Sequence, residues 1–154
     1  MSDTARFTTA ADARAFLTGG NATVTLVSTK TGTRFTYKIR AADDGKVHFV
    51  SLLNGPDNES DYKYLGRIAR GVTFWAGRKV PKAGDIGPEA PSSAAFAWTW
   101  RQILNNALPD TLEVWHEGRC GRCNRKLTVP SSIASGWGPE CADKMGFSAS
   151  WAGF

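Results

Sequence analysis

The sequence predicts an α+β protein: a small antiparallel sheet with an N-terminal helix, then a second helix and a C-terminal treble-clef-like zinc knuckle. Apolar and polar side chains alternate along residues 34–40, which is typical of a strand with one buried face. Residues 92–107 instead carry apolar side chains at helical spacing. All three cysteines lie within residues 120–141. This odd and clustered set favours a shared metal ion over a disulfide framework.

The first elements have clear boundary signals. Thr9 is suited to cap a helix that carries Asp12 in its first turn, and Gly19-Gly20 is suited to end it. A strand is expected at residues 23–27, followed by a turn at Thr31-Gly32. In the next strand, one face is apolar and the opposite face is basic; the apolar residues are Phe35, Tyr37 and Ile39.

Three further strands are expected before the middle of the chain. Residues 47–53 form the first of them, and a loop rich in turn-forming residues follows at 54–58. Residues 61–68 fit either a strand or a helix, and we prefer the strand because the preceding strand and loop suit a hairpin. Residues 72–75 are expected to add the last strand of this group.

A glycine- and proline-rich loop at residues 76–91 divides the chain into an N-terminal α+β domain (1–75) and a helix with a zinc-knuckle module (92–154). Ser92 or Ser93 is expected to cap a helix running to about Ala107, and a short strand follows at residues 112–115. Trp98 falls on the polar side of this helix. It either packs on the sheet or the knuckle, or marks a surface that binds a partner.

Composition narrows the class of protein. Apolar residues make up 42% of the chain, which is enough for a core. The sequence contains no run of about 18 apolar residues, the length that a membrane-spanning helix needs. The first residues have no signal-peptide pattern, so we expect a cytoplasmic protein that does not contact membranes. The net charge of +5 permits binding to nucleic acid or to an acidic protein surface.

The spacing of the cysteines predicts one structural zinc ion. Cys120 and Cys123 have the C-x-x-C spacing of a metal-binding turn. Cys141 follows a Gly-Pro pair that is suited to start a helix, whose positive end stabilises a thiolate. His116 is the expected fourth ligand, because structural zinc prefers four closed positions. The alternative is a surface histidine beside a water-filled fourth position.

No catalytic pattern accompanies this site. The H-x-E and P-C-x-x-C segments of zinc deaminases and the H-E-x-x-H pattern of metalloproteases are missing. A set of four protein ligands also leaves no open position for a substrate. We therefore expect a protein that is not an enzyme.

Basic residues form two groups with two interpretations each. Arg119, Arg122, Arg125 and Lys126 surround the predicted metal site, where they either contact nucleic acid or offset the charge of the thiolates. Arg34, Lys38, Arg40, Lys63 and Arg67 lie in the predicted strands. They either follow a phosphate backbone, with Tyr62, Tyr64 and Trp75 as base-stacking platforms, or form an ordinary solvated face.

The motifs H-x3-C-x2-C at 116–123 and G-x-G-P-x-C at 136–141 resemble a short zinc-knuckle domain of unknown function that occurs in many phage and bacterial proteins. Residues 54–62 look like the N-terminal half of the same group. Asn124 and Trp137 depart from the usual glycine and smaller apolar residue, and neither departure removes a ligand. The resemblance implies an association with phages or mobile elements and implies no particular activity.

Together these observations predict a non-enzymatic, zinc-stabilised accessory protein that binds DNA or RNA. The alternative is a protein-binding module, such as a phage factor that inhibits a host defence or replication protein. The sequence alone does not separate these two functions, and it does not indicate an oligomeric state.

Overall fold

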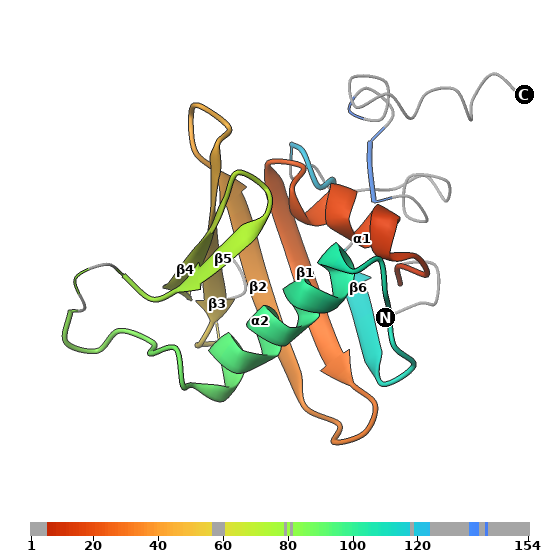
Figure 1. Cartoon of the computed structure of the whole chain (residues 1–154). Helices are drawn as coiled ribbons and strands as arrows, with labels where there is room; N and C mark the ends of the chain where they lie inside the picture. Colours follow the sequence, from red (N-terminus) through yellow and green to blue (C-terminus); the bar gives the residue numbers. More distant parts are fainter. Residues whose placement is uncertain are drawn as a thin grey trace, which may run out of the picture.

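The structure is a computed structural model of the chain and describes residues 6–56, 61–78, 80, 82–117, 119–123, 136–138 and 141. It is an α+β fold in which two helices lie on an antiparallel sheet of six strands, ordered β5-β4-β3-β2-β1-β6 (Figure 1). The strands are β1 (Asn21–Ser28), β2 (Arg34–Ala41), β3 (Val47–Leu53), β4 (Tyr62–Ala69), β5 (Thr73–Ala76) and β6 (Leu112–His116). Within the described residues, no helix has the length and apolar character needed to cross a membrane.

Helix α1 (Ala10–Leu17) begins where the sequence predicts. The Thr9 hydroxyl accepts a hydrogen bond from the backbone N–H of Asp12 at 3.1 Å, which satisfies one of the free donors of the first turn. The helix buries Ala13, Phe16 and Leu17 against the sheet. Phe16 is fully buried near the end of α1, where the metal-binding segment also lies.

Strands β1 to β5 form an antiparallel meander that confirms the predicted alternation. Tyr37 and Ile39 on β2 are fully buried, and they pair with residues of β1 and β3 whose side chains enter the same core. We call this side, covered by the helices, the inner face, and the opposite side the outer face. Residues 62–69 form strand β4, so the strand interpretation of this region is confirmed.

Helix α2 (Pro91–Leu104) corrects the predicted cap. Its N-cap is Ala90, without a side-chain cap, and Ser92 and Ser93 both lie inside the first turn. Pro91 explains the earlier start, because its fixed φ and missing N–H suit the first helical position. The helix also ends at Leu104 rather than near Ala107, and Asn106 then adopts a positive φ of 58°.

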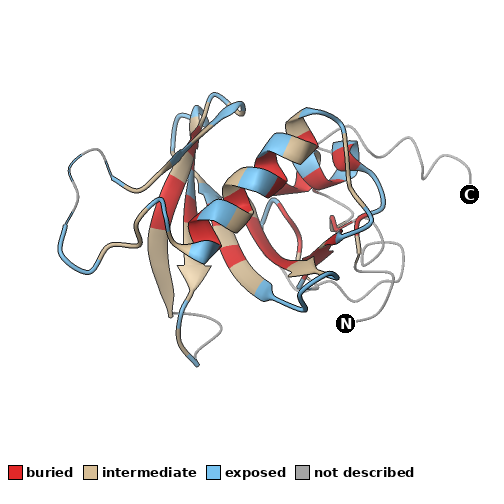
Figure 2. Ribbon diagram, turned by 60° about the horizontal axis from the view of Figure 1, so that its bottom comes forward, coloured by how far each residue is buried: buried red, intermediate tan, exposed pale blue. Residues whose placement is uncertain are grey.

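Helix α2 crosses the inner face and closes the core. Phe96, Trp100 and Ile103 are buried, as their spacing predicts, whereas the outward side of the helix is exposed (Figure 2). The Tyr37 hydroxyl donates to the Ser92 carbonyl at 2.7 Å, and Trp100 Nε1 donates to the Val72 carbonyl at 2.7 Å. These bonds satisfy polar atoms that the core would otherwise leave unpaired.

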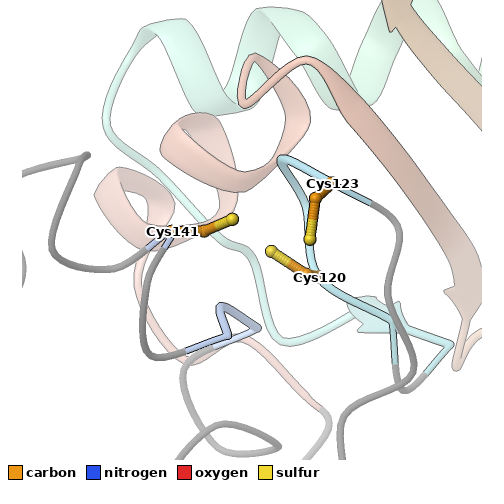
Figure 3. A group of neighbouring side chains, drawn as sticks. All are labelled: Cys120, Cys123 and Cys141. Carbon is orange, nitrogen blue, oxygen red and sulfur yellow. The ribbon is translucent and has the colours of Figure 1, made fainter.

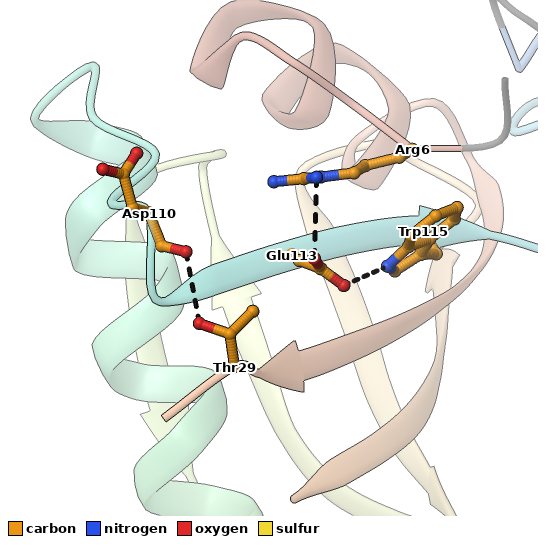
Figure 4. Close-up of polar contacts among 5 residues, drawn as sticks. All are labelled: Arg6, Thr29, Asp110, Glu113 and Trp115. Atoms are coloured by element: carbon orange, nitrogen blue, oxygen red, sulfur yellow. Dashed lines mark hydrogen bonds and ion pairs between the residues drawn. The ribbon is translucent and has the colours of Figure 1, made fainter. Parts of the chain in front are cut away.

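Strand β6 joins the sheet beside β1, although some eighty residues of sequence lie between them. Arg6 forms an ion pair with Glu113 at 3.5 Å, and Trp115 Nε1 donates to the same carboxylate at 3.1 Å (Figure 4). At the start of β6, the Thr29 hydroxyl donates to the Asp110 carbonyl at 3.3 Å. Helix α2 and strand β6 thus share one core with the N-terminal strands, and the division of the chain into domains stays a prediction.

Candidate metal centre

Three cysteine side chains converge beside the end of α1. Cys120 and Cys123 lie in the segment that follows β6, and Cys141 approaches from the other side (Figure 3). The three Sγ atoms all lie within 4.8 Å of one another. Cys120 and Cys141 are buried, whereas Cys123 is exposed at the edge of the group.

This arrangement fits a thiolate-binding metal ion. Tetrahedral ligands about 2.3 Å from a zinc ion lie roughly 3.8 Å from one another. The sulfur atoms lie within 4.8 Å of one another, so side-chain adjustments would bring them to three corners of the tetrahedron. A set of thiolates selects soft or borderline ions such as zinc over magnesium or calcium.

Backbone donors prepare one of the sulfurs to be a thiolate. The N–H of Arg122 points to Cys120 Sγ at 3.4 Å, as expected inside a C-x-x-C turn. Burial works to raise the pKa of Cys120, but backbone N–H groups of Cys123, Gly138 and Arg122 outweigh it, and the pKa lies below its ordinary value. Hydrogen bonds to the charged form therefore favour a thiolate at this position.

Cys141 behaves in the opposite way. Burial raises its pKa, and the neighbouring Cys123 and Cys120 raise it further, although Arg122 Nη1 lies 3.7 Å from its sulfur and acts against this shift. Deprotonation of Cys141 is therefore unfavourable while Cys120 is already a thiolate. A bound cation would remove that resistance, because it interacts favourably with each of the converging thiolates.

His116 is adjacent to this centre but is not among the grouped ligand atoms. Its ring is almost fully buried, with centroids 5.6 Å from Phe7 and 5.7 Å from Phe16. The structure brings together three of the four predicted ligands, and the assignment of His116 as the fourth stays a prediction.

The metal-binding segment is docked on α1 through glycines, a feature that the sequence interpretation missed. A Cβ atom at Gly121 would lie 2.6 Å from Phe16 Cδ2, and one at Gly136 would lie 2.8 Å from the same atom. The backbone therefore touches the ring at two points. Gly121 also accepts a hydrogen bond from Asn21 N and donates one to the Gly136 carbonyl, both at 2.9 Å. The glycines of the knuckle could have predicted this contact, because glycine lets a backbone approach a neighbouring side chain closely.

Trp137 completes the contact between the metal-binding segment and α1. Its ring centroid lies 5.8 Å from that of Phe16 in an edge-on arrangement, and its far edge lies where a side chain on Gly19 would have to be. Trp137 is only 4% exposed. The residue that departs from the resembled family therefore packs into the core beside the cysteines.

The predicted basic residues near the centre have different surroundings. Arg122 is exposed and directs both its backbone and side-chain donors toward sulfur atoms, which agrees with the charge-offsetting interpretation. Arg119 is half-buried and has interactions of its own. Arg125 and Lys126 lie outside the described residues, as do Pro139 and all residues after Cys141.

The basic residues of the sheet are divided by a β-bulge. Arg34, Lys38 and Arg40 alternate with the buried residues of β2, which places them on the outer face, and Arg67 on β4 joins them there. The register shifts between Val50 and Ser51, so that Lys63 pairs with Leu52, an inner-face residue. Lys63 is therefore separated from the other four.

Trp98 is 37% exposed and lines a groove between α2 and the far ends of β1 and β2. The groove has a volume of about 570 Å³, and Leu26, Phe35 and Leu112 contribute to its walls. The tryptophan therefore lies near the end of the sheet and stays partly exposed.

Comparison with known protein families matches part of the chain. Residues 111–146, which contain β6 and the three cysteines, match a family of unknown function, DUF6011. No curated protein and no solved structure matches the chain. The chain is thus similar to this family over its metal-binding segment.

Proposed function

We propose that this protein is a non-enzymatic accessory protein that binds nucleic acid and whose C-terminal segment is held by one structural zinc ion. In this proposal Cys120, Cys123 and Cys141 supply thiolates, His116 supplies the fourth ligand, and the segment forms a treble-clef-like knuckle. An origin in a phage or mobile element belongs to the same proposal and rests on the sequence resemblance alone.

The observation that carries nucleic-acid binding is the charge distribution on the outer face. Lys38 and Arg40 lie on β2 and Arg67 lies on β4, the two strands that flank β3, and all three are on the side of the sheet away from both helices. Within the six strands the acidic residue is Glu113 on β6, at the other end of the sheet, where it pairs with Arg6; Glu117, directly after β6, accepts a hydrogen bond from Thr25. The sheet thus presents a basic half to a polyanion.

Salt-dependent binding tests this proposal. Labelled DNA and RNA oligonucleotides, single- and double-stranded, are titrated with the protein at about 50 mM and 200 mM salt. We expect measurable binding that weakens steeply with salt, because phosphate contacts release condensed counterions. An absence of binding to every oligonucleotide at the lower salt concentration contradicts the proposal.

The groove beside Trp98 favours a second candidate function, binding to a host protein. An exposed tryptophan next to an apolar groove is a common anchor at protein interfaces. In this case Trp98→Ala abolishes capture of a host protein while leaving the oligonucleotide titrations unchanged. The same variant is silent in both assays if the groove has no partner.

A further inference from the structure

Four residues of alternating type form a line across the outer face. The strand register pairs Arg40 with Phe49, Phe49 with Arg67, and Arg67 with Trp75. Directly paired residues of neighbouring strands point to the same side of a sheet. We call these four residues the outer-face row; it runs across β2, β3, β4 and β5 in the order basic, aromatic, basic, aromatic.

The aromatic members of this row are open to solvent. Phe49 is 41% exposed and Trp75 is 54% exposed. The strand spacing places them about 9–10 Å apart, with one arginine between them. Large exposed aromatic rings on a structured strand have flat apolar surfaces on which a ring-shaped ligand can stack.

The cationic members are available as well. The ion pairs found among the described residues are Arg6–Glu113 and Arg78–Asp85, and neither involves Arg40 or Arg67. Arg40 is exposed, and Arg67 is partly so. Both guanidinium groups can therefore accept an external anion such as a phosphate, which matches their planar donor geometry.

The two tyrosines that the sequence offered as stacking platforms are already engaged. Lys38 Nζ lies 4.4 Å from the centre of the Tyr62 ring, and Arg78 Cζ lies 4.8 Å from that of Tyr64. In the part of the chain that the structure describes, these are the cation–π contacts. Phe49 and Trp75 carry no such cation and are exposed, whereas Trp115, also on the outer face, is buried.

One end of the row adjoins the metal-binding segment. Arg40 pairs with Asn21, and the backbone N–H of Asn21 donates to the Gly121 carbonyl between the two knuckle cysteines. The exposed side chain of Arg122 follows directly after Gly121. The row thus ends beside the metal-binding segment, where the Arg122 guanidinium is directed toward Cys141 Sγ at 3.7 Å.

We propose that the outer-face row is a binding site for single-stranded nucleic acid, an inference that rests on the proposed function and specifies its ligand. Bases stack on Phe49 and Trp75, and backbone phosphates pair with Arg40 and Arg67. Single strands are the ligand because their bases can turn outward onto aromatic rings, whereas a duplex keeps its base faces stacked internally. The site reads no particular sequence, since every base offers a flat face.

Fluorescence anisotropy with a labelled dT12 oligonucleotide tests the site, with a duplex of equal length as the comparison ligand. Trp75→Leu and Phe49→Leu remove the flat rings and keep apolar bulk. Each is expected to weaken dT12 binding about 5- to 150-fold, the range of single base–aromatic contacts. Arg40→Gln and Arg67→Gln are each expected to lower the slope of log K against log salt by about 0.7.

Matched controls lie away from the row. Trp98 and Arg101 are exposed on α2, on the inner side of the sheet, so Trp98→Leu and Arg101→Gln change the same residue types elsewhere. They are expected to leave dT12 binding within about twofold of wild type. Circular dichroism and thermal melts check that each variant is folded, which is expected because the replaced side chains are exposed or, for Arg67, partly exposed.

The outcomes separate this inference from the broader proposal. Weakened dT12 binding in the row variants, with normal controls and weak duplex binding, supports the site. If the wild-type protein binds nucleic acid but the aromatic variants bind dT12 normally, the row is overturned while nucleic-acid binding stands. If the wild-type protein binds no oligonucleotide at low salt, both are overturned.

Discussion

Replacement of Gly121 by alanine measures how tightly the metal-binding segment is docked on α1. The new Cβ would lie 2.6 Å from Phe16 Cδ2 and 2.7 Å from Cε2, well inside van der Waals contact. The Phe16 ring cannot retreat freely, because Phe7 and Trp137 lie against it with centroids 5.0 Å and 5.8 Å away. The clash must therefore be relieved by moving the backbone between Cys120 and Cys123.

The expected cost follows from two opposing terms. Overpacking a filled core costs about 1–3 kcal/mol, and the immobile ring places this site toward the upper end. Alanine in place of glycine returns about 0.4–1 kcal/mol by restricting the unfolded chain. We therefore expect Gly121→Ala to lower the free energy of unfolding by roughly 1–2 kcal/mol in urea denaturation with zinc present, together with weaker zinc binding.

Gly138→Ala is the matched control, because no atom other than those of its two chain neighbours lies within 4 Å of its added Cβ and its backbone needs no positive φ. This variant is expected to change stability by less than about 0.5 kcal/mol. Phe16→Leu combined with Gly121→Ala should recover part of the loss, with a coupling of about 0.5–3 kcal/mol. Equal effects of the two glycine variants, or strict additivity with Phe16→Leu, would refute the docked arrangement.

Three other perturbations probe the same account. Tyr37→Phe should cost about 0.5–1.5 kcal/mol at neutral pH by removing the bond to the Ser92 carbonyl. Burial holds the pKa of Tyr37 far above its ordinary value; the unfolded chain therefore ionises first, and wild-type stability falls as pH rises above about 10. The gap between wild type and Tyr37→Phe in urea titrations should consequently narrow above that pH, and a constant gap would contradict the burial argument. His116→Phe should lower zinc affinity in a competition assay with a chromogenic chelator, because it removes a fourth donor while keeping a ring beside Phe7 and Phe16. An unchanged zinc affinity would show that the imidazole packs in the core and does not bind the metal. Acidification of the zinc-loaded protein should release the metal, because protons compete with it for the thiolates, and the chromogenic chelator reports the release. Cys123→Ser should release zinc at a higher pH than wild type.

Local sequence signals predicted much of the fold because local interactions decide those features. Thr9 and Asp12 predicted the start of α1, because the hydrogen bond between them spans only three residues. Residues 47–53 matched β3 at both ends, since the surrounding turns bound the strand on each side. Pro91 shows the limit of such signals: a serine cap and a proline first turn compete, and the proline determined the helix start.

Contacts between distant residues could not be predicted in the same way. Nothing in residues 112–116 shows that they pair with β1 rather than standing apart with the knuckle. The bulge after Val50, which moves Lys63 to the inner side, likewise depends on how β3 and β4 meet. Phe49 was missed as a candidate binding residue because its exposure and its place beside Arg40 and Arg67 arise from register.

The candidate metal centre was more predictable than its setting. The spacing of Cys120 and Cys123 and the Gly-Pro pair before Cys141 carried enough local chemistry to name the three sulfurs that the fold brings together. The packing of Phe16 against the backbone of Gly121 and Gly136 could not be predicted, because about a hundred residues of sequence separate Phe16 from these glycines.

Metal content measured side by side in wild-type protein and Cys123→Ser tests the central claim most directly. Elemental analysis of wild type, after dialysis against metal-free buffer, is expected to give one zinc ion per chain, and Cys123→Ser is expected to give far less. Strong chelation of wild type should also lower its melting temperature. Wild-type protein without zinc, or with a melting temperature that chelation leaves unchanged, would contradict the account.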